Sequence, residues 1–280
     1  MSLDQSVTGL LYLVSIFAVF GLGKWVYDTL HRSFVLRVEL LEKDNLALAL
    51  AVAGYYFGLT MAVGGILVGP SSGWLDDVIE ILLYGAVSIL LLNLSIWIND
   101  KAILYRFSNR KEIIEDQNVG TGIIVAGNHI AVGLIIAGAV SGEGDLITAA
   151  VFWIIGQLIL ILGGLFYNWI TPFDIHQEIE RDNAAVGVAF AGVLVALGNV
   201  IREAVAGDFI SWQENLVELA AFVAFALILL PLIRMATDKL LLPGARLTAE
   251  LVNQAKPNVG AGVIEAFSYI AASFLVGWVV

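Results

Sequence analysis

Two groups of polar residues lie inside long apolar stretches, where ionisable side chains are costly. Glu265, Ser268 and Tyr269 follow one another at helical spacing in one stretch, and Asn128 and His129 occupy the middle of another. Residues three and four positions apart share one face of a helix. Ionisable groups at membrane depth are by default candidates for an ion or proton path. We therefore expect Glu265 and His129 to act as ion or proton sites, with Asn128, Ser268 and Tyr269 as their hydrogen-bonding neighbours.

A structural role is the alternative for the same residues. If the helices that carry them pack together, His129 and Glu265 would form a buried pair that holds those helices in register. Contact with another subunit is a third interpretation. The residue types alone do not separate the three interpretations.

The composition is that of a protein built for lipid. Hydrophobic residues make up 59% of the chain and charged residues only 14%, whereas about a quarter of a soluble domain is charged. The absence of cysteine excludes disulfides and thiolate metal sites. The acidic balance, 25 Asp and Glu against 14 Lys and Arg, argues against a nucleic-acid partner. We expect an integral membrane protein whose main partner is the lipid bilayer.

Several apolar stretches are long enough to cross a bilayer, which takes about 20 residues. The connections after the first, third, fifth and seventh stretches hold all the Lys and Arg except Arg202. By the positive-inside rule these long connections face the cytoplasm, and both termini lie outside. The eight predicted spans are roughly 7–27, 46–69, 78–98, 119–140, 146–168, 184–204, 215–236 and 259–280.

A short phrase, an Asn followed by small residues, opens every second span. Its four copies begin at Asn45, Asn118, Asn183 and Asn258. The first and third copies are separated by about half the chain, and so are the second and fourth. We therefore predict an all-α fold of two tandem four-helix repeats, residues 1–140 and 141–280. Both repeats point the same way because each has an even number of spans.

The repeated phrase has a structural interpretation. Asn is among the best helix N-caps, and small residues let helices approach closely in lipid. We therefore expect Asn45, Asn118, Asn183 and Asn258 to be N-caps. The alternative is an anion or lipid headgroup bound at these helix starts. Acidic neighbours such as Asp44 would repel an anion, so the pattern favours capping.

Two acidic residues lie at equivalent places near the predicted outer surface. Glu80 and Glu218 are related by the same offset as Asn45 and Asn183. They could ring the entrance of a cation path. Acidic side chains also suit the first turn of any solvated helix, which explains them equally well.

The paired module resembles a known family. The Asp-Asn at Asp44 and the Asn-Val-Gly-x-Gly that begins at Asn118, each repeated in the second half, are similar to the YjfL-like bacterial inner-membrane family. That family is a domain of unknown function, number 350, that usually occurs in tandem. The resemblance implies a bacterial inner membrane and a duplicated four-helix unit, and it loosely suggests a link to envelope stress. It implies no catalytic residues.

Two classes of function follow. The favoured one is a channel or transporter for ions, protons or a small solute, with its site at the interface of the two repeats. The alternative is a non-catalytic membrane organiser that forms a homo-oligomer through Gly and Ala faces and engages a cytoplasmic peripheral partner. An enzyme is not expected, because the chain has no zinc, nucleophile-elbow or phosphate-loop motif. No cofactor or metal is expected.

Overall fold

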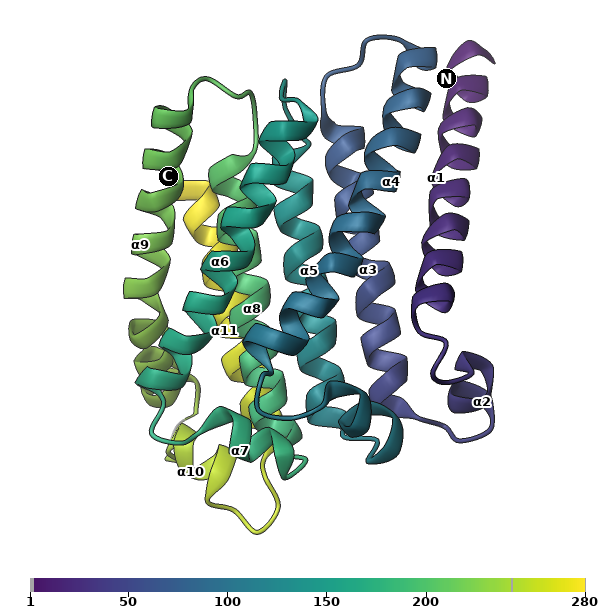
Figure 1. The fold of residues 1–280 in the computed structure, drawn as a ribbon. Coiled ribbons are helices and arrows are strands. Elements are labelled where there is room, and N and C mark those ends of the chain that lie inside the picture. Colours follow the sequence, from purple (N-terminus) through teal and green to yellow (C-terminus); the bar gives the residue numbers. More distant parts are fainter. Residues whose placement is uncertain (1–2, 243, 280) are drawn as a thin grey trace.

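The protein is a bundle of long helices (Figure 1). The computed structural model describes residues 3–242 and 244–279, and within them eight helices are long and apolar enough to cross a membrane. This finding confirms the predicted all-α, eight-span class. The eight are α1 (Leu3–Leu30), α3 (Leu46–Val68), α4 (Trp74–Ile98), α5 (Val119–Ala139), α6 (Leu146–Ile170), α8 (Ala184–Val205), α9 (Trp212–Ala236) and α11 (Val259–Val279).

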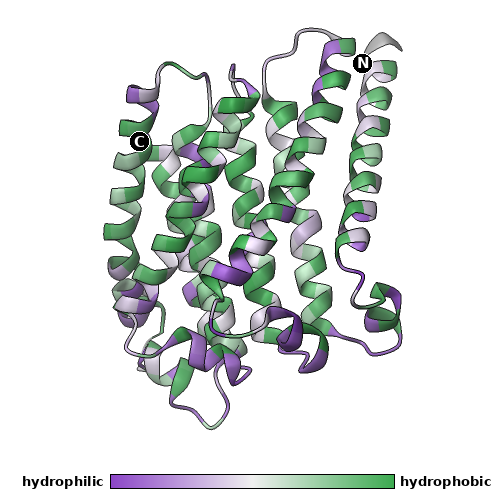
Figure 2. Ribbon diagram, in the orientation of Figure 1, coloured by the Kyte–Doolittle hydropathy of each residue, from purple (hydrophilic) through white to green (hydrophobic). Residues whose placement is uncertain are grey.

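Short helical segments gather at one end of the bundle, which we call the connector face; the opposite end, where α1 begins, is the terminal face (Figure 1). Figure 2 shows hydrophilic residues concentrated at the connector face and hydrophobic residues along the long helices. The short segments are α2 (Leu36–Leu41), α7 (Ile175–Glu180) and α10 (Leu247–Val252), with π-helical turns η1 (Asn99–Ile103), η2 (Lys111–Glu115) and η3 (Thr237–Leu241).

Helices α3, α5, α8 and α11 pack against one another in chain order and form what we call the central row. The other four long helices flank this row. Helices α5 and α8 are the most enclosed, with 78% and 83% of their apolar windows buried, against 17% for α1 and α9. The middle of the row is therefore the core of the protein, and α1 and α9 are its main lipid-facing helices.

The backbones of the central row touch through glycine. A Cβ added at Gly133 of α5 would lie 2.1 Å from the carbonyl oxygen of Gly58 in α3. One added at Gly192 of α8 would lie 2.4 Å from the Cα of Ala266 in α11. Such approaches exclude any side chain, which is how helices pack tightly in lipid. These small faces, expected to join subunits, are thus occupied within the chain.

Each repeat contains two similar units. A unit consists of a flanking helix, a connector segment and a helix of the central row, so that α1, α2 and α3 form the first and α6, α7 and α8 form the third. The phrase that begins with Asn stands at the same place in every unit. The duplication seen in the sequence is therefore built on a finer fourfold pattern of helix pairs.

Candidate functional site

The four Asn of the repeated phrase begin the helices of the central row. Each side-chain oxygen accepts a hydrogen bond from the backbone N–H three residues later, at 2.9 to 3.2 Å. The residues before three of them, Asp44, Gln117 and Asp182, have φ values of 52°, 52° and 57°. This left-handed conformation turns the chain sharply from the connector into the helix.

The amide nitrogens of these Asn tie the units together. Each donates to a glutamate of its own connector, in the pairs Asn45–Glu39, Asn118–Glu112, Asn183–Glu178 and Asn258–Glu250. The first three also donate to a backbone carbonyl of the next connector, those of Ile113, Ile179 and Leu251. Both amide hydrogens of these three Asn are used, so their side chains have no donor left for a ligand.

The glutamates of these pairs differ in their electrostatics. Lys43 donates to Glu39 at 2.7 Å, and this hydrogen bond lowers the pKa of Glu39. Burial raises the pKa of Glu112, although Asn118 donates to it at 2.9 Å. Geometrically similar pairs therefore hold glutamates whose pKa values are shifted in opposite directions.

Glu265 lies at a closed polar cluster in the second repeat. The residue is fully buried, and its Oε1 accepts hydrogen bonds from Tyr167 at 2.9 Å and Tyr269 at 3.1 Å. Arg234 of α9 forms an ion pair with the same oxygen and donates to Thr248 at 3.3 Å. The cluster joins α6, α9 and α11. Arg234 compensates the charge of this buried carboxylate, while the second oxygen, Oε2, has no hydrogen-bond partner among the described residues.

His129 and Glu265 do not meet, which corrects the expectation that helices α5 and α11 pair across the repeat interface. Helix α8 packs on both and lies between them. His129 instead contacts α3, and Glu265 contacts α6 and α9. All four helices of the central row carry small faces, and the side chains alone do not specify which faces pair.

His129 is held with one nitrogen free. It lies midway along α5 and is 1% exposed, with Nδ1 3.1 Å from the carbonyl oxygen of Ala51 and its ring edge-on to Tyr55 at 5.9 Å. When Nδ1 carries the proton for that carbonyl, Nε2 is an acceptor. Nε2 has no hydrogen-bond partner among the described residues.

A cavity of about 110 Å³ reaches His129 from the connector face. Its wall includes Tyr27 of α1, His31 just after the end of α1, and Asp100 of η1. Asn109 donates to Asp100 at 2.5 Å. This volume has room for several water molecules, and the wall offers them polar partners. Water can therefore lie between the connector face and a buried imidazole.

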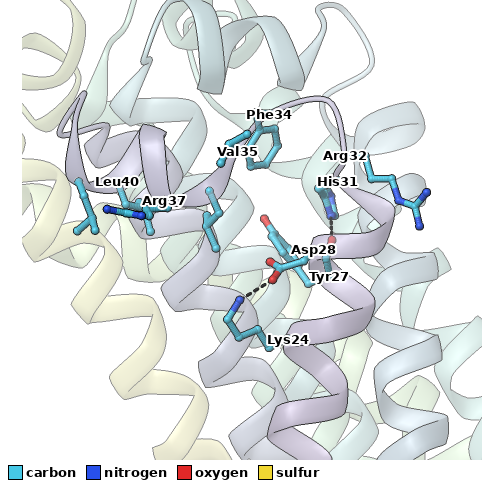
Figure 3. A pocket seen from close by; sticks show the side chains of 11 residues that line it. Lys24, Tyr27, Asp28, His31, Arg32, Phe34, Val35, Arg37 and Leu40 are labelled. Atoms are coloured by element: carbon cyan, nitrogen blue, oxygen red, sulfur yellow. Dashed lines mark hydrogen bonds and ion pairs between the residues drawn. The ribbon is translucent and has the colours of Figure 1, made fainter.

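The same wall borders a wider pocket. Tyr27, His31 and Phe34 line both the inner cavity and a pocket of about 630 Å³ between α1 and α2. Figure 3 shows His31 bonded to the Tyr27 carbonyl and Lys24 bonded to Asp28 on the α1 side of this pocket, with Arg37 and Leu40 on the α2 side. The wide pocket therefore adjoins the cavity at His129, and we call it the vestibule.

A second cavity lies at the terminal face of the first repeat. Its volume is about 140 Å³, and Tyr12, Asp77 and the predicted outer acid Glu80 line it. Tyr12 donates a short hydrogen bond to Asp77. The two cavities thus lie toward opposite faces of the first repeat.

Apolar side chains separate these two cavities. Val19 lies between Tyr12 and Tyr27 along α1 and packs against Gly85 of α4. Leu59 of α3 and Ile89 of α4 lie beside Gly23, about one turn further along α1. Val19, Leu59 and Ile89 are each exposed by no more than 2%. We call them the apolar seal.

The remaining predicted residues lie outside both sites. Asn128 is buried, and neither of its amide atoms has a partner among the described residues. Ser268 donates to the carbonyl of Ile264 in its own helix at 2.7 Å and so is not part of the Glu265 cluster, which corrects its predicted place there. Glu218 is exposed on α9.

Sequence reasoning missed the partners that define each site. Arg234 follows Pro231 near a helix end, a pattern typical of an arginine that reaches for the interface, yet it turns inward to Glu265. Tyr27 and Tyr167, one at each site, occupy matching positions in the two halves of the chain. The separation of Tyr27 and Tyr167 in the sequence equals that of Asn118 and Asn258. The internal repeat could therefore have identified these two tyrosines as equivalent site residues.

Comparisons with known proteins agree with a duplicated membrane protein. The family model described as "Domain of Unknown Function (DUF350)" matches residues 1–140 and again residues 143–280. A "UPF0719 transmembrane protein" of Aquifex aeolicus is 22% identical over 270 residues, 94% of this chain and 97% of that protein. "UPF0719 transmembrane protein YshE" of Bacillus subtilis is 26% identical over 132 residues, 47% of this chain and 96% of that protein. No solved structure matches.

Proposed function

We propose that this multi-pass transmembrane chain, which belongs to the DUF350 family, carries protons or small cations across a bacterial inner membrane through its first repeat. The observation that carries the proposal is His129, a buried imidazole with a free Nε2 that lines a cavity reached from the connector face. An imidazole is the side chain best suited to gain and lose a proton near neutral pH. The path thus lies within one repeat rather than between the two.

The rest of the first repeat supports a gated path. Cavities with polar groups in their walls lie toward the connector and terminal faces, and the apolar seal of Val19, Leu59 and Ile89 lies between them. Hydrophobic constrictions of this kind close ion paths by excluding water. The described state is a closed one, and transport needs a movement of α1 against α3 and α4. Helix α1 is suited to move because most of its surface faces lipid.

Proton flux into proteoliposomes tests the proposal. We expect His129→Gln to reduce flux to the level of empty liposomes while the protein stays folded. His176→Gln is the matched control, because His176 is a second buried histidine that bonds a backbone carbonyl but lies away from this cavity. Flux that survives His129→Gln, or that both variants abolish equally, would contradict the assignment.

The organiser role has less support. The glycine faces that were expected to join subunits pack inside the central row. A homo-oligomer would have to use another surface, such as the lipid-facing side of α3 with Phe57 exposed. We further propose that the connector face is cytoplasmic, because nearly all the Lys and Arg lie there.

A further inference from the structure

The vestibule between α1 and α2 has chemistry that the proton path does not use. Its wall carries Lys24, Arg32 and Arg37 but only one acid, Asp28. Lys24 is paired with Asp28 at 2.5 Å. Neither Arg32 nor Arg37 has an ion-pair or hydrogen-bond partner among the described residues. The pocket therefore presents two unpaired positive charges.

Apart from Arg37, the α2 side of this pocket is apolar. Leu36, Leu40 and Leu41 of α2 line it, with Val35 at the start of that helix. Leu41 and Val35 are 76% and 63% exposed. Because α2 lies at the connector end of a lipid-facing helix, the pocket opens at the depth where phospholipid headgroups meet their acyl chains.

The second repeat shows that the fold does not require these charges. Helices α6 and α7 are the counterparts of α1 and α2, and the space between them is a cavity of only about 10 Å³. Gly164 stands where the first repeat has Lys24. His176 stands where α2 has Arg37, and it is buried against the carbonyl of Ile103 at 2.8 Å.

We infer that the vestibule binds the headgroup of an anionic phospholipid from the leaflet at the connector face. Figure 3 shows Arg32 and Arg37 at opposite sides of the vestibule, so their two charges would attract the phosphate from either side. Either guanidinium offers several donors that match phosphate geometry. The apolar side chains of α2 would contact the start of the acyl chains. Basic pockets beside membrane helices bind anionic lipids in this manner. The bound lipid would cover the entrance to the cavity at His129.

Lipid titration of the purified full chain, followed by native mass spectrometry, tests this inference. Phosphatidylglycerol is the probe, and phosphatidylcholine is the neutral comparison. Each basic residue near a membrane surface contributes about fivefold in affinity for anionic lipid. We expect Arg32→Gln with Arg37→Gln to weaken binding of the first phosphatidylglycerol by roughly thirtyfold. Arg32→Lys with Arg37→Lys should retain most of the affinity, because the charge is kept.

The matched control removes two charges from the same face but far from the pocket. Arg246→Gln with Lys256→Gln changes exposed residues of the last connector and should leave the first binding step nearly unchanged. An equal loss in this control would overturn the inference, because it would show a general charge effect. Equal binding of phosphatidylcholine would also overturn it.

The phosphate group that binds in the vestibule could come from free phosphate instead of a lipid headgroup. Inorganic phosphate or glycerol phosphate added to the titration would lack the acyl contacts with α2, so neither should displace phosphatidylglycerol at similar concentration. Displacement by inorganic phosphate at matched concentration would reject the lipid assignment. This binding assay involves no proton flux, so its outcome is independent of the proposed transport function.

Discussion

The two repeats place different chemistry at equivalent positions. Glu265 and Tyr269 of the second repeat correspond to Val125 and His129 of the first. Arg234 corresponds to Ile96. In the second repeat the acid, the arginine and the tyrosines fill the space between α6, α9 and α11. In the first repeat the same space is the cavity that ends at His129.

This difference indicates that the two repeats have different roles in the protein. The ion pair of the second repeat fastens a flanking helix, α9, to the central row through Arg234. The first repeat has no such fastening among its described residues at this position, and its flanking helix α1 is bordered by cavities at both faces. One repeat is thus organised for rigidity, and the other keeps accessible space.

The largest effect is expected from breaking the ion pair. Glu265→Leu leaves the Arg234 guanidinium buried without its partner, which typically costs about 3 to 5 kcal/mol. The free energy of unfolding in mixed micelles, measured by titration with dodecyl sulfate, checks this value. The double variant Glu265→Leu with Arg234→Met should recover most of the loss. If the double variant were as unstable as the single one, the cluster would not be the fastening described.

A second effect concerns the tight crossing of α3 and α5. The second repeat has Ser273 where the first has Gly133. Gly133→Ser would place Cβ 2.1 Å from the Gly58 carbonyl oxygen and should cost about 1 to 3 kcal/mol. The same unfolding assay measures it. Gly64→Ser, at a site with nothing within 4 Å, should change stability by less than about 1 kcal/mol; equal losses in the two variants would show that the crossing is not tight.

Cysteine labelling can compare how accessible the equivalent positions of the two repeats are to a reagent in water, since the natural chain has no cysteine. Ala51 lines the cavity at His129, and its counterpart Ala189 is equally buried but lines none of the cavities described here. Ala51→Cys should react with a small methanethiosulfonate at least about tenfold faster than Ala189→Cys, because modification needs an accessible thiolate. The rates can be followed by mass spectrometry. Equal rates would remove the distinction between the repeats.

The smallest effect is the pH dependence of two Asn-linked glutamates. The pKa of Glu39 is lowered by Lys43, so its contribution to stability is present above the ordinary pKa of glutamate and is lost as pH falls through the lowered value. The pKa of Glu112 is raised by burial, so its contribution is present at low pH and is lost as pH rises through the raised value.

Glutamine substitutions separate these two cases. At neutral pH Glu39→Gln should destabilise the protein and Glu112→Gln should not, each by less than about 1 kcal/mol. Unfolding midpoints between about pH 3 and pH 7, a range that extends below and above the ordinary pKa of glutamate, measure the difference. Parallel curves for the two variants would contradict the opposite pKa shifts.

Much of the architecture follows from the sequence because it depends on local patterns. Apolar length predicts the spans, and the constant offset of the Asn phrases predicts the duplication. The side chain of Asn45 accepts from Leu48 as a local N-cap does. Each of these features requires only a few neighbouring residues, so no knowledge of the packing is needed.

The site was harder to predict because it depends on which faces meet. The direction of the Arg234 side chain is decided by Glu265, 31 residues further along the chain. The sequence does not show whether His129 and Glu265 are in contact, because that depends on the position of α8 between their two helices. A cavity is a property of what the neighbours leave unfilled, and the presence of Val125 in place of an acid gave only an indirect sign of it.

The lateral bonds of the Asn side chains also imply an order of assembly during synthesis. Asn45 can complete its bonds only after Ile113 has left the ribosome, and Asn118 and Asn183 wait in turn for Ile179 and Leu251. Asn258, the last of the series, donates to Glu250 of its own connector. Each newly inserted helix pair therefore satisfies a donor left by the pair before it.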